Sequence, residues 1–173
     1  MASSGLFSPR LIDKSVSESF PPSYSVRPLS RDDYNKGFFE CLHSLTWTGD
    51  VSNDRFVEQF DWMAGKDIFY VVVIEHDDKV IGTGVIMVGR KYIWDLARQG
   101  HIEDVSISDA HQGKGLGKLL LKTLASIGHN VGCGKIILNC SEEKKGFYEN
   151  CGYEHNGLQM SLNLPGFTEE PPQ

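Results

Sequence analysis

Apolar residues recur along most of the chain at spacings that predict alternating strands and helices. Residues 24–29 alternate like a strand, and Ser30 with Asp33 three residues later predicts a capped helix start. A second helix is expected after Ser52, where apolar residues repeat at helical spacing until Gly65. The first helix would carry Tyr34, Phe38, Cys41, Leu42 and Leu45 inward, and the second would carry Phe56, Phe60 and Met63.

The middle of the chain predicts a hairpin, a further strand and a long helix. Runs rich in β-branched residues at 68–76 and 79–89 are joined by a short polar turn, which is typical of a β-hairpin. Residues 101–108 form the next expected strand. The leucine-rich stretch 116–131 has one apolar face and predicts a helix on a sheet, and 135–140 predicts another buried strand.

The last part of the chain predicts a short helix at 146–151, ending at Gly152, and two strands at 153–155 and 158–164 that would close the sheet. This order of elements predicts an α/β fold, a single domain with a mixed, mostly antiparallel sheet flanked by helices. The domain is expected to span residues 23–164. Polar, proline-containing composition predicts flexible segments at 1–22 and 165–173.

Composition narrows the classes of function. With 173 residues, one domain and one site are expected. A net charge of -6 argues against a nucleic-acid partner, because binding to phosphates needs a basic face. The four cysteines and six histidines show no pairing typical of a metal site. No segment reads as a membrane span or secretion signal, so a soluble cytoplasmic protein without a membrane partner is expected.

The most informative segment is a glycine-rich loop between a predicted strand and the long helix. Glycines let a backbone approach an anion, and the first N–H groups of a helix have no partners within it. A pyrophosphate would satisfy these groups, aided by the helix dipole and two lysines; the alternative is a simple glycine-rich turn. The loop comprises Gln112, Gly113, Lys114, Gly115, Leu116, Gly117 and Lys118.

Two familiar phosphate loops do not fit this segment. The kinase-type P-loop would need glycine at Gln112 and a hydroxyl at Leu119, and the dinucleotide fingerprint would need glycine at Lys118. The remaining pattern, Q-x-x-G-x-G after EDVSIS, resembles motif A of the GNAT acetyltransferase superfamily, where this loop holds the pyrophosphate of CoA. The resemblance implies a GNAT-like fold and acetyl-CoA as co-substrate, with no metal.

Further segments narrow the resemblance within the superfamily. Residues 135–153, LTWTGDVS (45–52), the stretch around Arg90 and Lys91, GHIEDVSIS (100–108) and GCGKIIL (132–138) resemble the family of glucosamine-6-phosphate N-acetyltransferases. This resemblance covers roughly residues 24–164. It implies direct transfer of acetyl from acetyl-CoA to the amine of that phosphosugar in a ternary complex, within UDP-N-acetylglucosamine biosynthesis, by a homodimer whose sugar sites draw on both chains.

The resemblance also assigns roles to residues. Backbone N–H groups of Asp104, Val105 and Ser106 would polarise the thioester carbonyl, with the pantetheine arm running toward Ile107. Tyr148 would face the CoA sulfur and assist the departing thiolate. Glu103 and Asp104 would serve the sugar amine and hydroxyls, although side chains alternate across a strand and the two cannot simply act as one pair. The sugar contacts would come from Thr46, Lys91, Trp94, Glu103, Asp104, Lys135 and Asn139.

Several positions depart from the family pattern. Asn139 replaces a frequent acidic residue of the fifth strand, Trp94 replaces a frequent histidine, and Lys144 replaces a common asparagine. Gly89 replaces an acidic residue, and Asn163 stands where some relatives carry an arginine that binds phosphate. Two alternatives therefore stay open. One is acetylation of another amine, such as a polyamine or a protein lysine, which an acidic groove would favour. The other is a binding module that senses acetyl-CoA without turnover.

Overall fold

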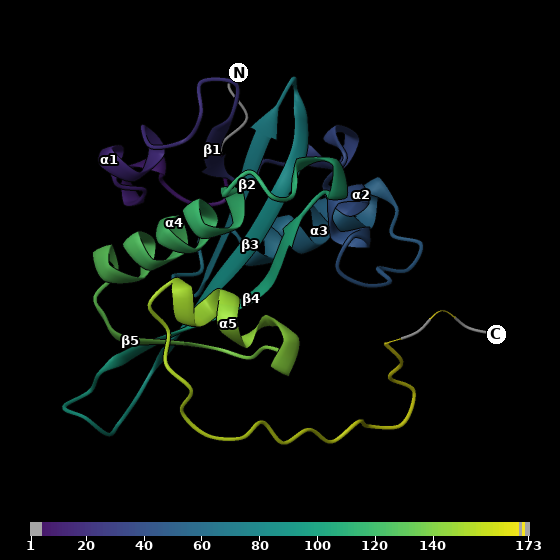
Figure 1. Ribbon diagram of the computed structural model, residues 1–173. Helices are drawn as coiled ribbons and strands as arrows, with labels where there is room; N and C mark the ends of the chain where they lie inside the picture. Colours follow the sequence, from purple (N-terminus) through teal and green to yellow (C-terminus); the bar gives the residue numbers. More distant parts are fainter. Residues whose placement is uncertain (1–4, 170, 172–173) are drawn as a thin grey trace.

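A five-stranded sheet lies at the centre of the computed structural model, which describes residues 5–169 and residue 171 (Figure 1). The strands follow one another in chain order, and all neighbours are antiparallel except β4 and β5, which run parallel. The predicted mixed, mostly antiparallel sheet is thereby confirmed. Its strands are β1 (Ser25–Pro28), β2 (Phe69–His76), β3 (Lys79–Arg90), β4 (Arg98–Ile107) and β5 (Cys133–Leu138).

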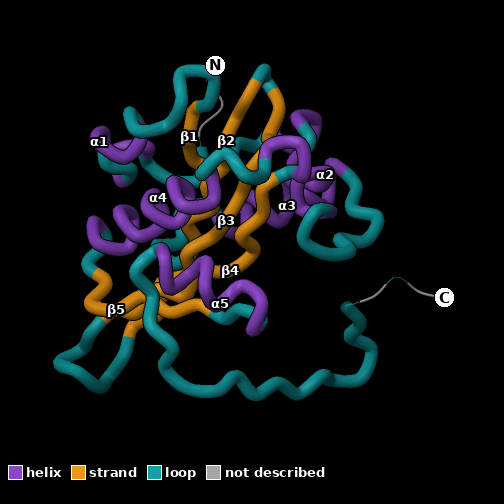
Figure 2. Tube along the Cα trace, viewed as in Figure 1, coloured by secondary structure: helices purple, strands orange, loops and turns teal. Residues whose placement is uncertain are grey.

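Helices cover both faces of this sheet (Figure 2). The long helix α4 (Leu116–Asn130) packs on one face, and α5 (Glu142–Asn150) lies beside it. The opposite face carries α2 (Phe38–His43) and α3 (Asn53–Met63). Each side therefore has its own apolar core, one built around the leucines of α4 and the other around the phenylalanines of α2 and α3.

The helix α4 confirms the prediction made from its apolar stripe. Leu116, Leu120 and Leu124 are almost fully buried against the sheet. Near the end of the helix the backbone comes very close to the sheet at Gly128, where an added Cβ would lie 2.8 Å from Ile136 Cδ1. The close approach fixes α4 across β5, and so fixes the start of α4 relative to the end of β4.

The predicted hairpin and the predicted helix after Ser52 are also confirmed. Asp77 and Asp78 both have positive φ, 48° and 59°, which is the geometry of a tight turn between right-twisted strands. Ser52 caps α3 by accepting a hydrogen bond from the Arg55 N–H at 3.4 Å. Local sequence chemistry therefore sets both boundaries.

The helix expected after Ser30 is instead split into two short pieces. Gly37 has a φ of 89° and separates the 3₁₀ helix η2 (Asp33–Lys36) from α2. Leu45, expected to face inward, lies beyond the end of α2 and is 48% exposed. The left-handed glycine turns the chain, so one continuous helical face does not form.

The segment 5–22, part of the start expected to be flexible, packs against the domain. It contains the 3₁₀ helix η1 (Pro9–Leu11) and the short helix α1 (Lys14–Ser17). Ile12 and Phe20 are buried in the core on the α4 side, because a few apolar residues in a serine-rich stretch suffice to fill that edge. Of the two segments expected to be flexible, residues 1–4, 170 and 172–173 lie outside the described residues.

The two strands expected at 153–155 and 158–164 are absent from the described chain. Residues 153–164 carry no assigned strand, and the chain after α5 runs away from the sheet as an extended arm (Figure 1). The arm alternates apolar and polar residues as a strand would, but its apolar side chains find no surface within this chain. Leu158 and Met160 are each 89% exposed. No helix in the described part of the chain is long and apolar enough to span a membrane.

Candidate active site

The centre of the site is a place where β4 bulges against β3 and separates from β5. On the β3 side, pairing shifts between Thr83 and Val85, opposite Asp104, whose φ is 52°. This is a β-bulge. On the β5 side, the last parallel pair joins Ile102 to Leu138, so that β4 continues to Ile107 beyond its pairing with β5. Backbone N–H and C=O groups of this last stretch of β4 can therefore bind a ligand lying between the two strands.

The glycine-rich loop follows directly from that end of β4. The Gln112 side chain donates hydrogen bonds to the Ile107 carbonyl at 2.9 Å and to the Asp109 carboxylate at 3.0 Å, which fixes the loop to the strand. Gly113 and Gly115 have φ values of 74° and 78°. Gly115 caps α4 without a side-chain hydrogen bond, which leaves the first N–H groups of the helix for an anion.

The helix α5 closes the other side of this opening. An added Cβ at Gly117 would lie 3.3 Å from Phe147 Cζ, so glycine allows α4 and α5 to touch near the loop. Tyr148, next to Phe147, packs against the core and makes an edge contact with Tyr153. Burial, with smaller effects of two nearby cysteines, raises the pKa of Tyr148, so its hydroxyl carries a proton at neutral pH.

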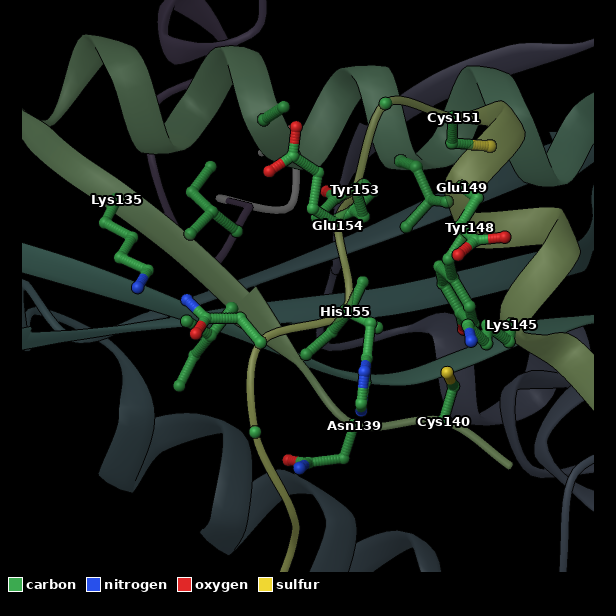
Figure 3. A pocket seen from close by; sticks show the side chains of 18 of the residues that line it. Lys135, Asn139, Cys140, Lys145, Tyr148, Glu149, Cys151, Tyr153, Glu154 and His155 are labelled. Atoms are coloured by element: carbon green, nitrogen blue, oxygen red, sulfur yellow. The ribbon is translucent and has the colours of Figure 1, made fainter. Parts of the chain in front are cut away.

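A cavity of about 1200 Å³ lies between α4, β5 and α5 (Figure 3). Tyr148 and Cys140 lie on its α5 side, and Lys135 and Asn139 line it from β5 and the residue that follows the strand. Lys118, in the first turn of α4, also lines it. Residues 153–159, which follow α5, form a further wall of this cavity.

A second cavity, of about 760 Å³, lies on the other face of the sheet, between the sheet and the helices α2 and α3. Glu103 and Asp104 both line it. The expectation that alternation separates these carboxylates is wrong here, because the bulge at Asp104 interrupts the alternation. Asp104 as a residue is exposed, yet its carboxyl lies in the mouth of the cavity, where desolvation raises its pKa.

Comparison with known proteins identifies the family to which this chain belongs. The model of the acetyltransferase (GNAT) family matches residues 31–153. The chain belongs to the GNAT family. It is 39% identical over 144 residues to glucosamine 6-phosphate N-acetyltransferase 1 of Dictyostelium discoideum, covering 82% of this chain and 91% of the relative. The Candida albicans glucosamine 6-phosphate N-acetyltransferase is 37% identical over 142 residues, covering 81% and 95%.

A solved structure gives the same result in three dimensions. The crystal structure of glucosamine-6-phosphate N-acetyltransferase from Arabidopsis thaliana aligns with a TM-score of 0.78 at 37% identity, covering 81% of this chain and 97% of that one. The predicted resemblance and fold class are thereby confirmed, and the chain is an acyltransferase by family. Among residues 5–169 and 171, no group of three or more histidine, cysteine and acidic side chains is arranged to hold a metal ion.

The structure brings together only some of the sugar contacts implied by family resemblance. Glu103, Asp104 and Asn139 lie near the point where β4 and β5 separate. Lys91 and Trp94 lie at the far end of the β3–β4 hairpin, where β4 begins at Arg98. At about 3.3 Å per residue, Arg98 is on the order of 17 Å along the strand from Glu103, so this end of the hairpin lies far from the carboxylates.

Two other implied contacts stand apart from the carboxylates within this chain. Thr46 is exposed in the loop after α2 and lines neither cavity. Lys135 is exposed near the start of β5, pairs across the sheet with Gln99 and lines the cavity on the α4 side. Within the described residues of this GNAT protein, the sugar contacts implied by the family therefore do not gather around one point.

Sequence reasoning missed one residue at the centre of this GNAT site. His101 lies between Glu103, at 3.3 Å from Nδ1 to Oε1, and Asn139, at 2.8 Å from Nε2 to Oδ1. The spacing of two residues between His101 and Glu103 on one strand was the available signal, because such residues share a face. The link to Asn139 could not be read from sequence, since it depends on the parallel register of β4 and β5.

Proposed function

We propose that this protein transfers the acetyl group of acetyl-CoA to the amine of glucosamine 6-phosphate, giving N-acetylglucosamine 6-phosphate and CoA. The observation that carries the proposal is the separation of β4 from β5 beyond Ile102, directly followed by the glycine-rich start of α4. The names of the relatives at 37–39% identity support the choice of acceptor. The reaction belongs to the route to UDP-N-acetylglucosamine, and we place it in the cytoplasm.

On the donor side, the chain offers main-chain groups where the parts of acetyl-CoA need them. The N–H groups from Gln112 to Lys118 bind the pyrophosphate, because the two left-handed glycines leave this backbone uncovered. The stretch from Val105 to Ile107 takes the pantetheine arm, and N–H groups of Asp104, Val105 and Ser106 polarise the thioester carbonyl. These donors are fixed by the fold and need no rearrangement during the reaction.

The chemistry then needs one proton removed and one supplied. The amine attacks the thioester carbon, the C–S bond breaks, and the proton lost from nitrogen passes to Glu103 or Asp104, directly or through water. Tyr148, whose raised pKa keeps its hydroxyl protonated, gives a proton to the leaving thiolate. The acetyl group moves in one step within the ternary complex, with no acyl-enzyme.

A homodimer is part of the proposal, because Lys91, Trp94 and Thr46 stand apart from Glu103 and Asp104 within one chain. The exposed hairpin end with Lys91 and Trp94, and the loop with Thr46, would serve the site of a second copy. The arm supports this assembly. Its residues 158–164 alternate like a strand, and β5 ends the sheet with one side unpaired in the described chain. Its apolar residues are Leu158, Met160, Leu162 and Leu164, which are 66–89% exposed.

Two experiments test these assignments. Lys135→Ala and Lys91→Ala should each raise KM for glucosamine 6-phosphate more than KM for acetyl-CoA, whereas Lys79→Ala, at the exposed start of β3, should change neither. Equal effects on both KM values would remove the two lysines from phosphate binding. For the dimer, deletion of residues 157–173 should give a monomer in sedimentation analysis, and a dimer that persists would show that the arm is not the interface.

An acceptor other than a phosphosugar is the second candidate function. The observation in its favour is the acidic lining of the cavity on the α3 side, to which Glu58, Glu103 and Asp104 all contribute. Such a lining suits a polyamine or a lysine side chain. Arg55 lines the same cavity and opposes that reading, since it supplies the positive charge a phosphate needs. Thiol release with a panel of amines separates the two candidates.

A further inference from the structure

His101 occupies the junction between the two strands that form the site. It lies on β4 two residues before Glu103, and its register partner on β5 is Ile137. Asn139 follows the end of β5 directly and Glu103 follows the last residue of β4 that pairs with β5, so the three polar side chains lie where the strands separate. His101 and Glu103 have side chains that are 32% and 40% exposed, which leaves both accessible to a small ligand.

The ring of His101 contacts polar side chains from both strands, through one ion-pair contact and one hydrogen bond. Nδ1 faces the Glu103 carboxylate oxygen at 3.3 Å, and Nε2 faces the Asn139 amide oxygen at 2.8 Å. One ring nitrogen therefore faces the Glu103 carboxylate within ion-pair distance, while the other is held by the hydrogen bond to Asn139.

We propose that His101 is a positioning residue for the acceptor amine, which holds the Glu103 carboxylate in the orientation that receives the amine's hydrogen bond while Asn139 holds the ring. This inference rests on the proposed acetyl transfer at this site. A carboxylate on an exposed strand has several rotamers, and selecting one of them before the amine arrives removes an orientation cost from the reaction. Within residues 5–169 and 171, Glu103 makes no other side-chain hydrogen bond or ion pair that could select it.

Two substitutions test separately the contact of His101 with Glu103 and its hydrogen bond with Asn139. In His101→Asn the amide nitrogen is bonded to Cγ, as Nδ1 is, so it can still donate to Glu103. In His101→Gln the amide is one bond further out and reaches toward Asn139 instead. We expect His101→Gln to lower kcat by on the order of tenfold, and His101→Asn to keep most of it, with the acetyl-CoA dissociation constant unchanged in both. His129→Gln, at the end of α4, serves as the matched histidine control.

A double-mutant cycle tests whether His101 acts through Glu103. In a Glu103→Gln background, a further His101→Gln change should have little additional effect on kcat, because the positioned carboxylate is already gone. Independent losses that add would overturn the proposal, as would a wild-type kcat in His101→Gln. Equal losses of kcat and of melting temperature in the Asn and Gln variants would show a purely structural role and overturn it too.

The proposed acceptor and the role of His101 can fail separately. If the wild-type protein does not acetylate glucosamine 6-phosphate, the proposed acceptor is wrong. The cycle is then measured with the amine that the wild-type protein does acetylate, since any acceptor amine must be oriented at the same carboxylates. A cycle without coupling in a protein that acetylates the phosphosugar leaves the proposed function intact and refutes the role of His101.

Discussion

Replacement of Gly115 by alanine gives a measurable test of the cofactor loop. Gly115 has a φ of 78°, and an added Cβ would meet no heavy atom within 4 Å. In the free protein the substitution therefore costs only backbone strain, about 1–2 kcal/mol for a side chain in the left-handed region. Bound pyrophosphate would face the new methyl group, so we expect acetyl-CoA affinity to fall by about tenfold or more, equivalent to about 1.4 kcal/mol.

A matched control separates strain from ligand contact. Gly65, after the end of α3, has a φ of 73° and equally open surroundings. Gly65→Ala and Gly115→Ala should lower the free energy of unfolding in urea by similar amounts, but only Gly115→Ala should weaken acetyl-CoA binding in calorimetry. Equal acetyl-CoA affinities for the two variants would refute the placement of the pyrophosphate. Gly117 is a poorer probe, because its added Cβ would press on Phe147 in the free protein.

Three further predictions concern the thiolate, the fold and pH. Tyr148→Phe should lower kcat in a thiol-release assay while the acetyl-CoA dissociation constant stays the same, and an unchanged kcat would remove its hydroxyl from the chemistry. Arg27→Met should destabilise the protein by about 3 kcal/mol in urea, because it leaves the fully buried Asp33 carboxylate without its ion-pair partner, at 2.7 Å. Burial and the charge of Lys114 lower the pKa of His111 below its ordinary value of 6.5. The folded protein therefore takes up a proton at His111 less readily than the unfolded chain does. The stability that the neutral ring contributes is present above pH 6.5 and is lost as pH falls. His111→Gln should therefore show a smaller drop in melting temperature than wild type between pH 8 and pH 5.5.

Much of the fold could be predicted because its signals are local. The aspartate pair of the β2–β3 turn, the serine cap of α3 and the leucine stripe of α4 each act within a few residues. The turn and the two helices form as these signals predict. The failures come from interactions that a local pattern cannot reveal. Gly37 splits a helix, while residues 158–164 carry a strand pattern without a partner in their own chain.

The site divides in the same way. The glycine-rich loop is recognisable because its phosphate-binding groups lie in one contiguous stretch at the start of a helix. The acceptor side depends on tertiary geometry. The bulge at Asp104 places two neighbouring carboxylates around one cavity, and the parallel register brings Asn139 to His101. Neither follows from a repeating pattern of polar and apolar residues, since both depend on where strand pairing stops.

The measurement that tests the central claim most directly is the kcat/KM of the wild-type protein for a panel of amines, followed by release of CoA thiol from acetyl-CoA. The panel contains glucosamine 6-phosphate, glucosamine, spermidine and a lysine peptide. Contacts to the phosphate, remote from the amine, should convert binding energy into orientation, so glucosamine 6-phosphate should be acetylated far faster than the others. Equal rates with unphosphorylated glucosamine, or thiol release with spermidine or the peptide alone, would contradict the proposed acceptor.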